Sequence, residues 1–506
     1  RFILHTACVL LSISAAHAQN PEYIRNLVPS TAKAHASLAS VAKVFSPVSI
    51  TNAPRSWPKP LSSSTPWTAA GTEFYACFPS VVGSSDGDPA TKIRSLFISS
   101  RAPARVTIEM LKGAFDTTFI VTPGQFGRVD IPIYDALNRD DFEVAESKVI
   151  HIFSKEIITV YGLSHNYQSS DGFVIYPTQV LGTSYLVMSA RNSVNYDLYG
   201  EIQTDTIKAP DTTLPNPRSE FAIVATQNNT NVTFTLTATS YSGRLLADST
   251  YTIRLDRGQV YQVMARDTGT HLTSNPPNST IDWWRLYAPW TGGPDCDLTG
   301  SYITSDKPIA VFSGHERAAS PSAREYDPIS PNRDHLVEQM LPTSAWGKNY
   351  IIAGSGQDNA MGRPAGGDVI RILSGFNNTH VTVNGTPMFT LAQGEYRDVL
   401  SGTTAVIASD LPVLVAHIMQ SSGTDNIGDP DLTLARPIED YANEYTLPPW
   451  NDFPAFTEPH LLVICDTSVT KTTLYNGVPF PSGYWNPIPG TSFSSGIFPV
   501  HYNLAQ

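Results

Sequence analysis

The sequence predicts an all-β protein, built as a tandem array of antiparallel β-sandwich-like modules. Short apolar runs that alternate with period two recur along the chain, and 39 prolines and 33 glycines punctuate them. Hardly any segment has the 3.6-residue period of an amphipathic helix. With 506 residues the chain exceeds one ordinary domain core, so several modules are expected. The alternative is closure of the modules into a propeller-like ring, although propeller blades have about four strands and roughly 40–50 residues.

The first residues have the pattern of an export signal. One basic residue precedes an apolar run at 2–13, and a small-x-small tripeptide follows at 16–18. We therefore expect residues 1–18 to be a signal peptide, and the product to be secreted or held at the cell surface. Residues 19–70 are rich in Pro, Ser and Ala, which predicts a linker or loosely docked arm. No later segment approaches the roughly 20 apolar residues of a membrane-spanning helix.

One ordered set of strand-forming segments then returns along the chain. Its opening element reads GTEFYACFP (71–79), GTSYLVMS (182–189) and GKNYIIAGS (347–355), with a looser copy, ANEYTLPP (442–449). Self-similarity in a fixed order indicates an internal duplication with about seven short strands per module. The predicted boundaries are 71–181, 182–346 and 347–441 for three modules and 442–506 for a partial fourth module.

Two further recurring segments predict how the strands are connected. Paired apolar runs such as IRSLFISSRAPARVTIEM (93–110) and VIRILSGFNNTHVTVNG (369–385) are predicted to be β-hairpins. In SDKPIAVFSGHE (305–316), the polar residues before Ile309 predict a turn. We expect Ile309 to Phe312 to be a core strand and His315 to close it.

Charge and cysteine content narrow the possible partners. The formal net charge is −12 and no Lys/Arg-rich run occurs, so nucleic-acid binding is not expected and acidic lipid surfaces are disfavoured. Cys77, Cys296 and Cys465 lie outside the predicted signal. This odd number permits one disulfide at most, and no pair can be assigned. The sequence gives no indication of the oligomeric state.

The second module is longer than the third because segments 266–296 and 315–335 interrupt the repeat. Long loops on a rigid sheet are where function usually sits. The first segment carries four aromatic rings that are suited to stacking on sugars or filling a partner's pocket, Trp283, Trp284, Tyr287 and Trp290. The alternative is that they fold inward as the loop's own core. We take them as candidate binding residues for an extracellular protein or glycan.

Calcium is the cofactor that a local pattern suggests, and no other cofactor is expected. The segment SGTDNIGDPDL (422–432) offers hard oxygen ligands, as exported β proteins often do between modules. The ligands would come from Asp425, Asn426, Asp429 and Asp431. Because the spacing matches no EF-hand loop, a plain acidic turn is the favoured interpretation.

No catalytic motif is complete. HERAA at 315–319 lacks the second histidine of a zinc-protease helix, no GxSxG elbow occurs, and the Gly-rich segment 354–368 lacks the P-loop lysine. A metal site built from this part of the chain would draw on His315, Glu316, Asp327, Asp334 and His335, but loop polarity is favoured. We expect a non-catalytic protein. The alternative is a carbohydrate-active or metal-dependent extracellular enzyme, for which paired carboxylates must face each other across a cleft.

The stretch CDLTGSYITSDKPIAVFSGHE (296–316), followed by DHLVEQMLPTSAWGKNYII (334–352), resembles the N-terminal domain family of IgG Fc-binding proteins. That family occurs in secreted mucus-associated proteins and many bacterial surface proteins, and this chain is similar to a bacterial-type secreted member. The resemblance implies extracellular, non-catalytic binding or adhesion. The family often has Cys where Arg317 and Arg333 stand here, which implies that a disulfide tying this loop is absent. No family-defined binding residue can be carried over.

Overall fold

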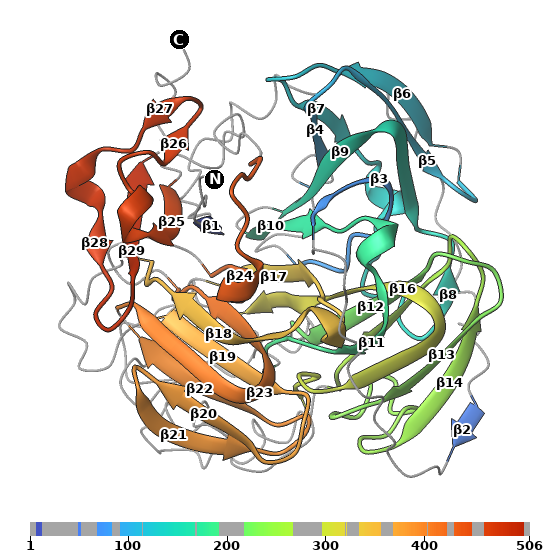
Figure 1. Cartoon of the computed structure of the whole chain (residues 1–506). Coiled ribbons are helices and arrows are strands. Elements are labelled where there is room, and N and C mark those ends of the chain that lie inside the picture. Colours follow the sequence, from blue (N-terminus) through green and yellow to red (C-terminus); the bar gives the residue numbers. More distant parts are fainter. Residues whose placement is uncertain are drawn as a thin grey trace, which may run out of the picture.

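The computed structural model confirms the all-β class. It describes residues 7–12, 49–51, 68–82, 92–113, 115–166, 169–191, 217–266, 296–318, 320, 333–355, 368–401, 403–421, 430–447 and 460–499. In these ranges the regular elements are antiparallel strands and short 3-10 turns. Figure 1 shows four main sheets arranged in chain order around a common centre. No helix in the described part of the chain is long and apolar enough to span a membrane.

The first sheet is organised by one long strand. It comprises β3 (Ala70–Ala76), β4 (Ile93–Ser100), β5 (Ala104–Met110), β6 (Asp116–Val121), β7 (Gly127–Asp130), β9 (Ile150–Asn166) and β10 (Ser169–Ile175). The first part of β9 pairs with β3 and β5, and its second part pairs with β4 and β10. Because β9 is shared in this way, the sheet curls into a sandwich-like module of seven strands.

The second and third sheets repeat this plan around β16 and β23. The second comprises β11 (Gly182–Leu186), β12 (Ser219–Ala225), β13 (Thr230–Thr235), β14 (Thr250–Leu255), β15 (Val260–Met264), β16 (Tyr302–Ala318) and β17 (Asp334–Gln339), with β2 (Ser49–Thr51) and β8 (Ala145–Glu146) added at its edges. The third comprises β18 (Gly347–Ile352), β19 (Asp368–Ser374), β20 (Thr379–Val383), β21 (Thr386–Leu391), β22 (Tyr396–Ser401), β23 (Ala405–Ile418) and β24 (Leu432–Leu434). Sheets of this size are larger than propeller blades, although they surround a centre as blades do.

The fourth sheet is smaller. It comprises β1 (Ala7–Ser12), β25 (His460–Asp466), β28 (Asn486–Pro487) and β29 (Phe493–Pro499). Beside it β26 (Leu474–Tyr475) and β27 (Val478–Pro479) form a separate two-stranded ribbon. The short 3-10 turns are η2 (Ile133–Asp135), η3 (Thr178–Val180), η4 (Thr343–Ala345), η5 (Ile438–Asp440), η7 (Thr467–Val469) and η8 (Ser482–Tyr484).

The core runs through neighbouring sheets because the central strands are buried on both faces. In β16, Ile309 and Val311 belong to a cluster that extends into the third sheet, whereas Ala310 and Phe312 belong to a cluster shared with the first sheet. All four side chains are fully buried. This confirms the predicted core strand, and it explains why the segment reads as a continuous apolar run rather than an alternating one.

The glycine that opens each module has a steric explanation. A Cβ atom added there would lie only 2.2–2.6 Å from a proline Cβ at the other end of the same module, in the pairs Gly71–Pro177 (2.3 Å), Gly182–Pro342 (2.6 Å) and Gly347–Pro437 (2.2 Å). Each glycine also stands at a register shift in the pairing of its strand with the central strand. Only glycine fits at this contact, which draws the two ends of each module together.

The predicted hairpins are wrong. β4 and β5 do not pair with each other, because β9 lies between them in the strand order β6-β5-β9-β4-β7. β19 and β20 flank β23 in the same way. The short connection between the two apolar runs therefore carries the chain from one layer of the sandwich to the other, and a strand from much later in the sequence fills the space between them.

The predicted turn before Ile309 is also wrong, and His315 does not close the strand. β16 continues without interruption to Ala318. Its polar residues lie where the strand passes from pairing with β13, which reaches Ser305, to pairing with β12, which begins at Ile309. Residues at this crossing are partly exposed, so polar side chains are accommodated without a chain reversal.

Candidate functional site

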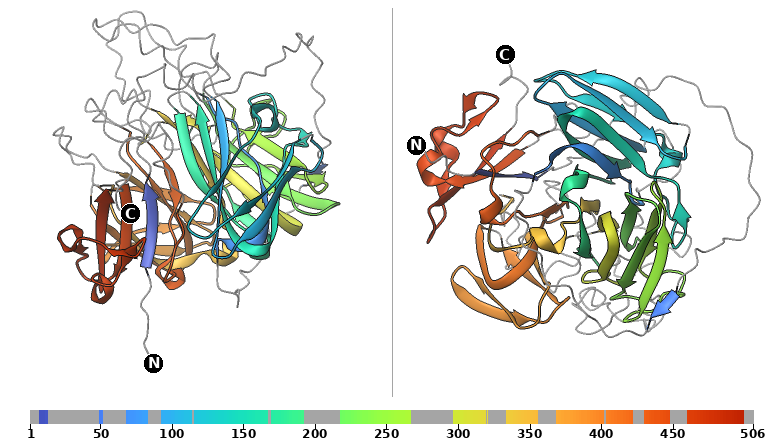
Figure 2. Two further views of the ribbon diagram at one scale, coloured as in Figure 1. Left: turned by 90° about the horizontal axis from the view of Figure 1, so that it is seen from above. Right: turned by 45° about the vertical axis from the view of Figure 1, so that its right-hand side comes forward.

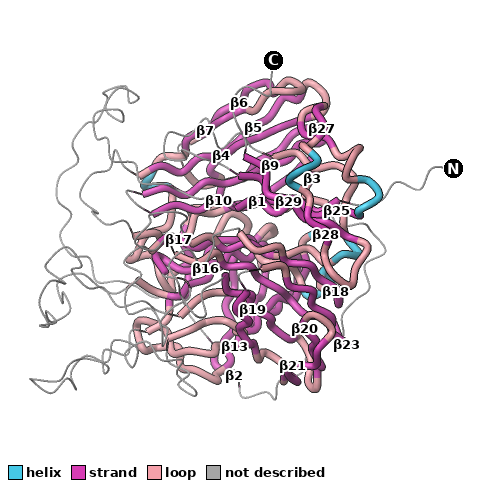
Figure 3. The backbone as a smooth tube through the Cα atoms, turned by 90° about the vertical axis from the view of Figure 1, so that its left-hand side faces the viewer, coloured by secondary structure: helices cyan, strands magenta, loops and turns pink. Residues whose placement is uncertain are grey.

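The long connections of the second and third sheets start and finish at one end of the strands. β11, β15, β16 and β18 lead into segments 192–216, 267–295, 321–332 and 356–367, which lie outside the described residues. Figures 2 and 3 show the strands of different sheets lying side by side. Hydrogen bonds between Ser320 and Ser421 connect the ends of β16 and β23 at this place. We call it the loop-bearing end, and it is the candidate binding surface.

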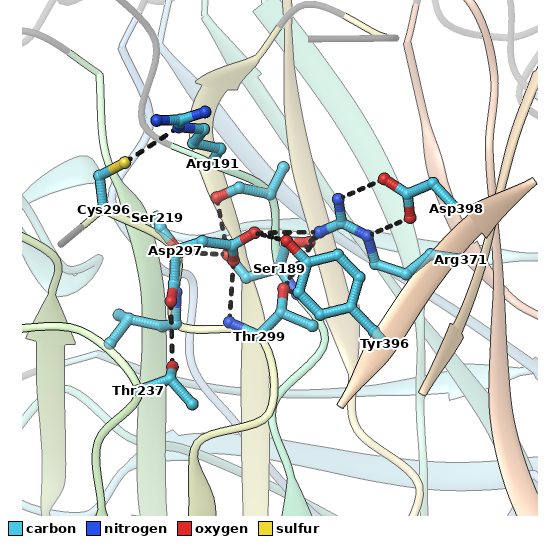
Figure 4. Close-up of polar contacts among 12 residues, drawn as sticks. Ser189, Arg191, Ser219, Thr237, Cys296, Asp297, Thr299, Arg371, Tyr396 and Asp398 are labelled. Atoms are coloured by element: carbon cyan, nitrogen blue, oxygen red, sulfur yellow. Dashed lines mark hydrogen bonds and ion pairs between the residues drawn. The ribbon is translucent and has the colours of Figure 1, made fainter. Parts of the chain in front are cut away.

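The predicted aromatic residues Trp283, Trp284, Tyr287 and Trp290 fall in 267–295, outside the described residues, so their role stays a prediction. The base of their loop is described. Cys296, where the chain returns, accepts a hydrogen bond through Sγ from Arg191 Nε at 3.1 Å. Figure 4 shows this contact beside the polar network that holds the following residues. Cys77 and Cys465 are buried free thiols.

A buried arginine joins the base of this loop to the third sheet. Arg371 of β19 places Nε and Nη2 each 2.8 Å from the carboxylate oxygens of Asp398. Its Nη1 donates to the backbone oxygen of Ser189 at 2.7 Å and to Asp297 Oδ2 at 3.2 Å. The Tyr396 hydroxyl donates to the same Asp297 oxygen at 2.9 Å (Figure 4). The planar guanidinium therefore fixes the carboxylate of Asp398 in β22 and that of Asp297, in the segment before β16, in one arrangement.

The pKa of Asp297 reflects this network. Burial opposes ionisation of the carboxyl group, but Arg371 and the hydrogen bonds of Thr299 hold its pKa below the usual value. The Arg371 guanidinium also lies over the ring of Tyr396, 4.1 Å from its centroid. Asp297 is therefore a fixed anion directly after Cys296, and the loop that ends there leaves from a rigid base.

Glu316, the acidic residue of the HE pair, has a structural role. Its fully buried carboxylate is bound on both oxygens by Arg139, with Nε–Oε1 at 2.8 Å and Nη2–Oε2 at 2.7 Å. The Ser80 hydroxyl donates to Oε1 at 2.9 Å, and the backbone N–H of Arg218 donates to Oε2 at 3.0 Å. Because Ser80 and Arg139 come from the first module's part of the chain, Glu316 ties that part to the end of β16.

His315 and His335, the two histidines of the alternative metal site, lie at the two ends of the inserted segment 315–335. His315 and His335 are fully buried, and burial lowers the pKa of each to about 3, so both are neutral. The backbone N–H of Arg317 donates to His315 Nδ1 at 3.0 Å, and His335 Nδ1 donates to the backbone oxygen of His315 at 3.0 Å. Asp327 lies outside the described residues. Among the residues that are described, no group of three or more His, Cys, Asp or Glu could hold a metal ion.

A buried acidic cluster lies where β10, β17 and β24 meet near the centre of the molecule (Figure 1). Asp171 Oδ2 accepts hydrogen bonds from the backbone N–H groups of Val337 at 2.8 Å and Leu432 at 3.4 Å, so one carboxyl group of the first sheet contacts the second and third sheets. Burial, and then the neighbouring Asp431, raise the pKa values of Asp171 and Glu338 well above normal. The other three residues predicted to bind calcium, Asp425, Asn426 and Asp429, lie outside the described residues.

Sequence reasoning missed the buried charged residues that hold the loop bases and form the acidic cluster. They are Arg139, Asp171, Asp297, Glu338, Arg371 and Asp398. Each acts through a partner far away in the chain, for example Arg371 with Asp297 and Arg139 with Glu316. No local spacing signals such a pair. The one available indication was a charged residue inside an otherwise apolar strand, as with Arg371 in β19, because such a charge is buried only with a partner.

Comparison with known proteins gives two matches. A family model described as IgGFc binding protein matches residues 171–504. A human protein described as IgGFc-binding protein is 27% identical over 264 residues, which cover 51% of this chain. The matched region is 4% of the human protein, so the chain spans a small part of that relative's length.

Proposed function

Because the chain belongs to the IgGFc-binding protein family, we propose that it is a non-catalytic binding or adhesion protein that is secreted or held at the cell surface. Its partner is an extracellular protein or glycan, and the Fc part of immunoglobulin G is the first protein to test. The apolar run at 2–13 with the tripeptide at 16–18 supports export. The family membership supports binding rather than catalysis.

The observation that carries this proposal is the construction of the loop-bearing end. Arg371 and Glu316 are buried at the bases of the two long loops of the second sheet, and each is bound by partners from another part of the chain. Buried and fully paired side chains of this kind hold a loop base in one position. A rigid base lowers the entropy that a long loop loses on binding, so the arrangement suits recognition of a partner.

We assign the contact itself to Trp283, Trp284, Tyr287 and Trp290, whose loop ends at Cys296 beside Arg191. Aromatic rings give a large contact area and have few rotatable bonds to immobilise. A few such rings usually dominate the free energy of binding at an interface. The assignment therefore predicts a small number of strongly contributing residues rather than a broad charged surface.

The carbohydrate-active alternative is disfavoured by where the acidic groups lie. Asp171 and Glu338 both have raised pKa values, as one member of a glycosidase pair must. However, their exposed fractions are 3% and 6%, and they are enclosed between three sheets. A sugar ring has to contact the catalytic carboxyl groups directly. These two groups are better explained as part of the packing between sheets.

The test is a binding screen of the full chain against immunoglobulin Fc and a glycan array, repeated with the triple variant Trp283→Ala, Trp284→Ala, Trp290→Ala. Each truncated ring is expected to cost about 2 kcal/mol of binding free energy, or roughly 30-fold in Kd. The control is Tyr134→Ala, a ring that is 75% exposed and belongs to η2 of the first module. Lost binding with an unchanged melting temperature supports the assignment. A large fall in melting temperature shows instead that the rings are the loop's own core, and a screen without any hit contradicts the function.

A further inference from the structure

The strands β6, β14 and β21 occupy equivalent positions at one side of the first three sheets. The equivalence follows from the register, because the first residue of the neighbouring strand pairs with the last residue of the edge strand in each sheet, in the pairs Ala104–Val121, Thr230–Leu255 and Thr379–Leu391. A pair of hydrogen-bonded threonines supports this equivalence for β6 and β14. Thr107 and Thr118 are joined by a 3.0 Å hydrogen bond between hydroxyl groups, as are Thr233 and Thr252.

Two of the three edges are protected against pairing with another chain. The edge of β14 is covered by β2, in which Ser49 to Thr51 pair with Thr252 to Thr250. The edge strand β21 carries Pro387 opposite Thr382, next to a register shift. Proline has no N–H to donate to an added strand, and a bulge distorts the edge, so both are common devices that prevent edge-to-edge association.

The edge strand β6 has neither form of protection. It is the terminal strand of its sheet, and no described residue pairs with its outer side. Its sequence DTTFIV contains no proline or basic residue, and its single charge is Asp116 at one end. Ile120 is 66% exposed on the solvent face of the strand. Figure 1 shows β6 at the outer rim of the molecule.

Among the other terminal strands, β7, β22 and β28 differ from β6 in length, charge or proline content, whereas β1 (ACVLLS) is also uncharged but lies toward the centre of the molecule, in contact with β24. β7 has four residues, and Arg128 in it forms an ion pair with Asp130. β22 carries Arg397 and Asp398, and the two-residue strand β28 ends in Pro487. Short strands, charges and prolines at an edge are the usual ways in which proteins avoid pairing. β6 is therefore a long, nearly uncharged edge strand at the outer rim of the molecule, and no described residue pairs with its outer side.

We propose that β6 is a self-association edge, at which two copies of the chain pair antiparallel about a two-fold axis and join their first sheets into one continuous sheet. A second copy is the occupant that fits, because it supplies the same open edge and requires no strand to leave another site. Antiparallel pairing about an axis at Phe119 sets Thr118 opposite Ile120 of the second copy and Ile120 opposite its Thr118, so no like charges meet. Most of the first sheet precedes residue 171, where the family match begins, so the proposal concerns a part of the chain to which that match assigns nothing.

The test is sedimentation velocity of the full chain over a wide concentration range, for the wild type and for the variant Thr118→Lys, Ile120→Lys. Both side chains face solvent, so the fold should tolerate lysine, whereas the dimer would place lysines directly opposite lysines. The matched control is Met388→Lys, Thr390→Lys, which adds the same charge to the solvent face of β21. We expect a dimer for the wild type and the control, and a monomer for the β6 variant.

Two results would overturn the proposal. One is a wild type that stays monomeric at every concentration, and the other is a dimer that survives in the β6 variant. Circular dichroism melts of both variants show whether either substitution unfolds the protein, and Ile120→Lys alone is the milder replacement if the double variant unfolds. Hydrogen exchange supplies an independent measurement. The amides of residues 116–121 should gain protection as the wild type dimerises, whereas those of β21 should not.

Discussion

The Nη1 atom of Arg371 lies 3.2 Å from Oδ2 of Asp297, so one ion pair connects the third sheet to the base of the aromatic loop of the second sheet. The same guanidinium binds Asp398. Arg371 and Asp297 are both largely buried, with side-chain exposures of 6% and 14%. A charge in this position depends on its partner, because water can no longer solvate the carboxylate that is left behind.

Replacing Arg371 by Met should therefore destabilise the protein strongly. The substitution keeps the apolar stem but leaves Asp297 and Asp398 without their cation, and a loss of about 3–5 kcal/mol in the free energy of unfolding is expected. Urea denaturation measures it. The control is Arg397→Met, whose side chain is 54% exposed in its ion pair with Glu395 and which should change stability by about 0.5 kcal/mol or less. Equal effects of the two substitutions would show that the buried network does not hold the junction.

Glu338→Gln should stabilise the protein, and more so as the pH rises. Burial, together with Asp431, raises the pKa of the folded-state carboxyl group above its unfolded value. The contribution of such a group is fully present below the unfolded pKa and is lost as the pH rises through the folded pKa. Glutamine does not ionise, so the variant does not lose stability as the pH rises through the pKa of residue 338. Melting temperatures measured from mildly acidic to mildly alkaline pH should diverge from wild type in the variant's favour, and a difference that does not change with pH would refute the argument.

Acid should destabilise the protein through His315 and His335. Each has a folded pKa of about 3 against an unfolded value near 6.5, so its contribution is present above the unfolded pKa and is lost as the pH falls. At pH 5 the loss is about 2 kcal/mol for each ring. His335→Gln should flatten the decline in stability between pH 7.5 and pH 5 in urea unfolding. An unaltered slope in the His335 variant would contradict the assignment.

A disulfide should form when Arg317 and Arg333 are both replaced by Cys. Ala318 pairs with Asp334 in the antiparallel register, so Arg317 and Arg333 lie diagonally across that pair, and the Nε atom of Arg317 donates to the backbone oxygen of Arg333 at 3.4 Å. The bond would close the loop between them and stabilise the protein by about 3 kcal/mol. The measurement is the melting temperature with and without reductant in a Cys296→Ser background. The single variants serve as controls. A double variant that keeps both thiols after oxidation would contradict the prediction that positions 317 and 333 can be joined by a disulfide.

Calcium binding at residues 425–431 stays a prediction, with Asp431 as the ligand whose surroundings are described. A bound ion at a hundred times its dissociation constant would stabilise the protein by about 2.7 kcal/mol. Calorimetry with calcium and then with chelator should show this shift in the wild type and not in Asp425→Asn, Asp429→Asn. A melt that is the same in calcium and in chelator would remove calcium from consideration.

The sequence was sufficient for the class of fold and for the position of most strands, because period-two alternation and turn residues are local signals. It was not sufficient for the connectivity. The runs in 93–110 look like a hairpin, and nothing in them reveals that β9, which begins at Ile150, lies between them. The same limit applies to the site. A segment with four aromatic residues can be found in the sequence, whereas the pairing of Asp297 with Arg371 arises only when distant parts of the chain pack together.

The contact between the opening glycine and the closing proline has a consequence for how such a chain can grow. Because Gly71 touches Pro177, the first and last parts of a module are neighbours in space, and a circularly permuted version would need only a short linker. The joint to the next module is also constant, since the glycine or its counterpart stands five positions after the proline in Pro177–Gly182, Pro342–Gly347 and Pro437–Ala442. A gene segment copied between two such joints would encode a unit that closes on itself. The number of sheets could therefore change by duplication or deletion while the chain path of each remaining sheet stayed the same.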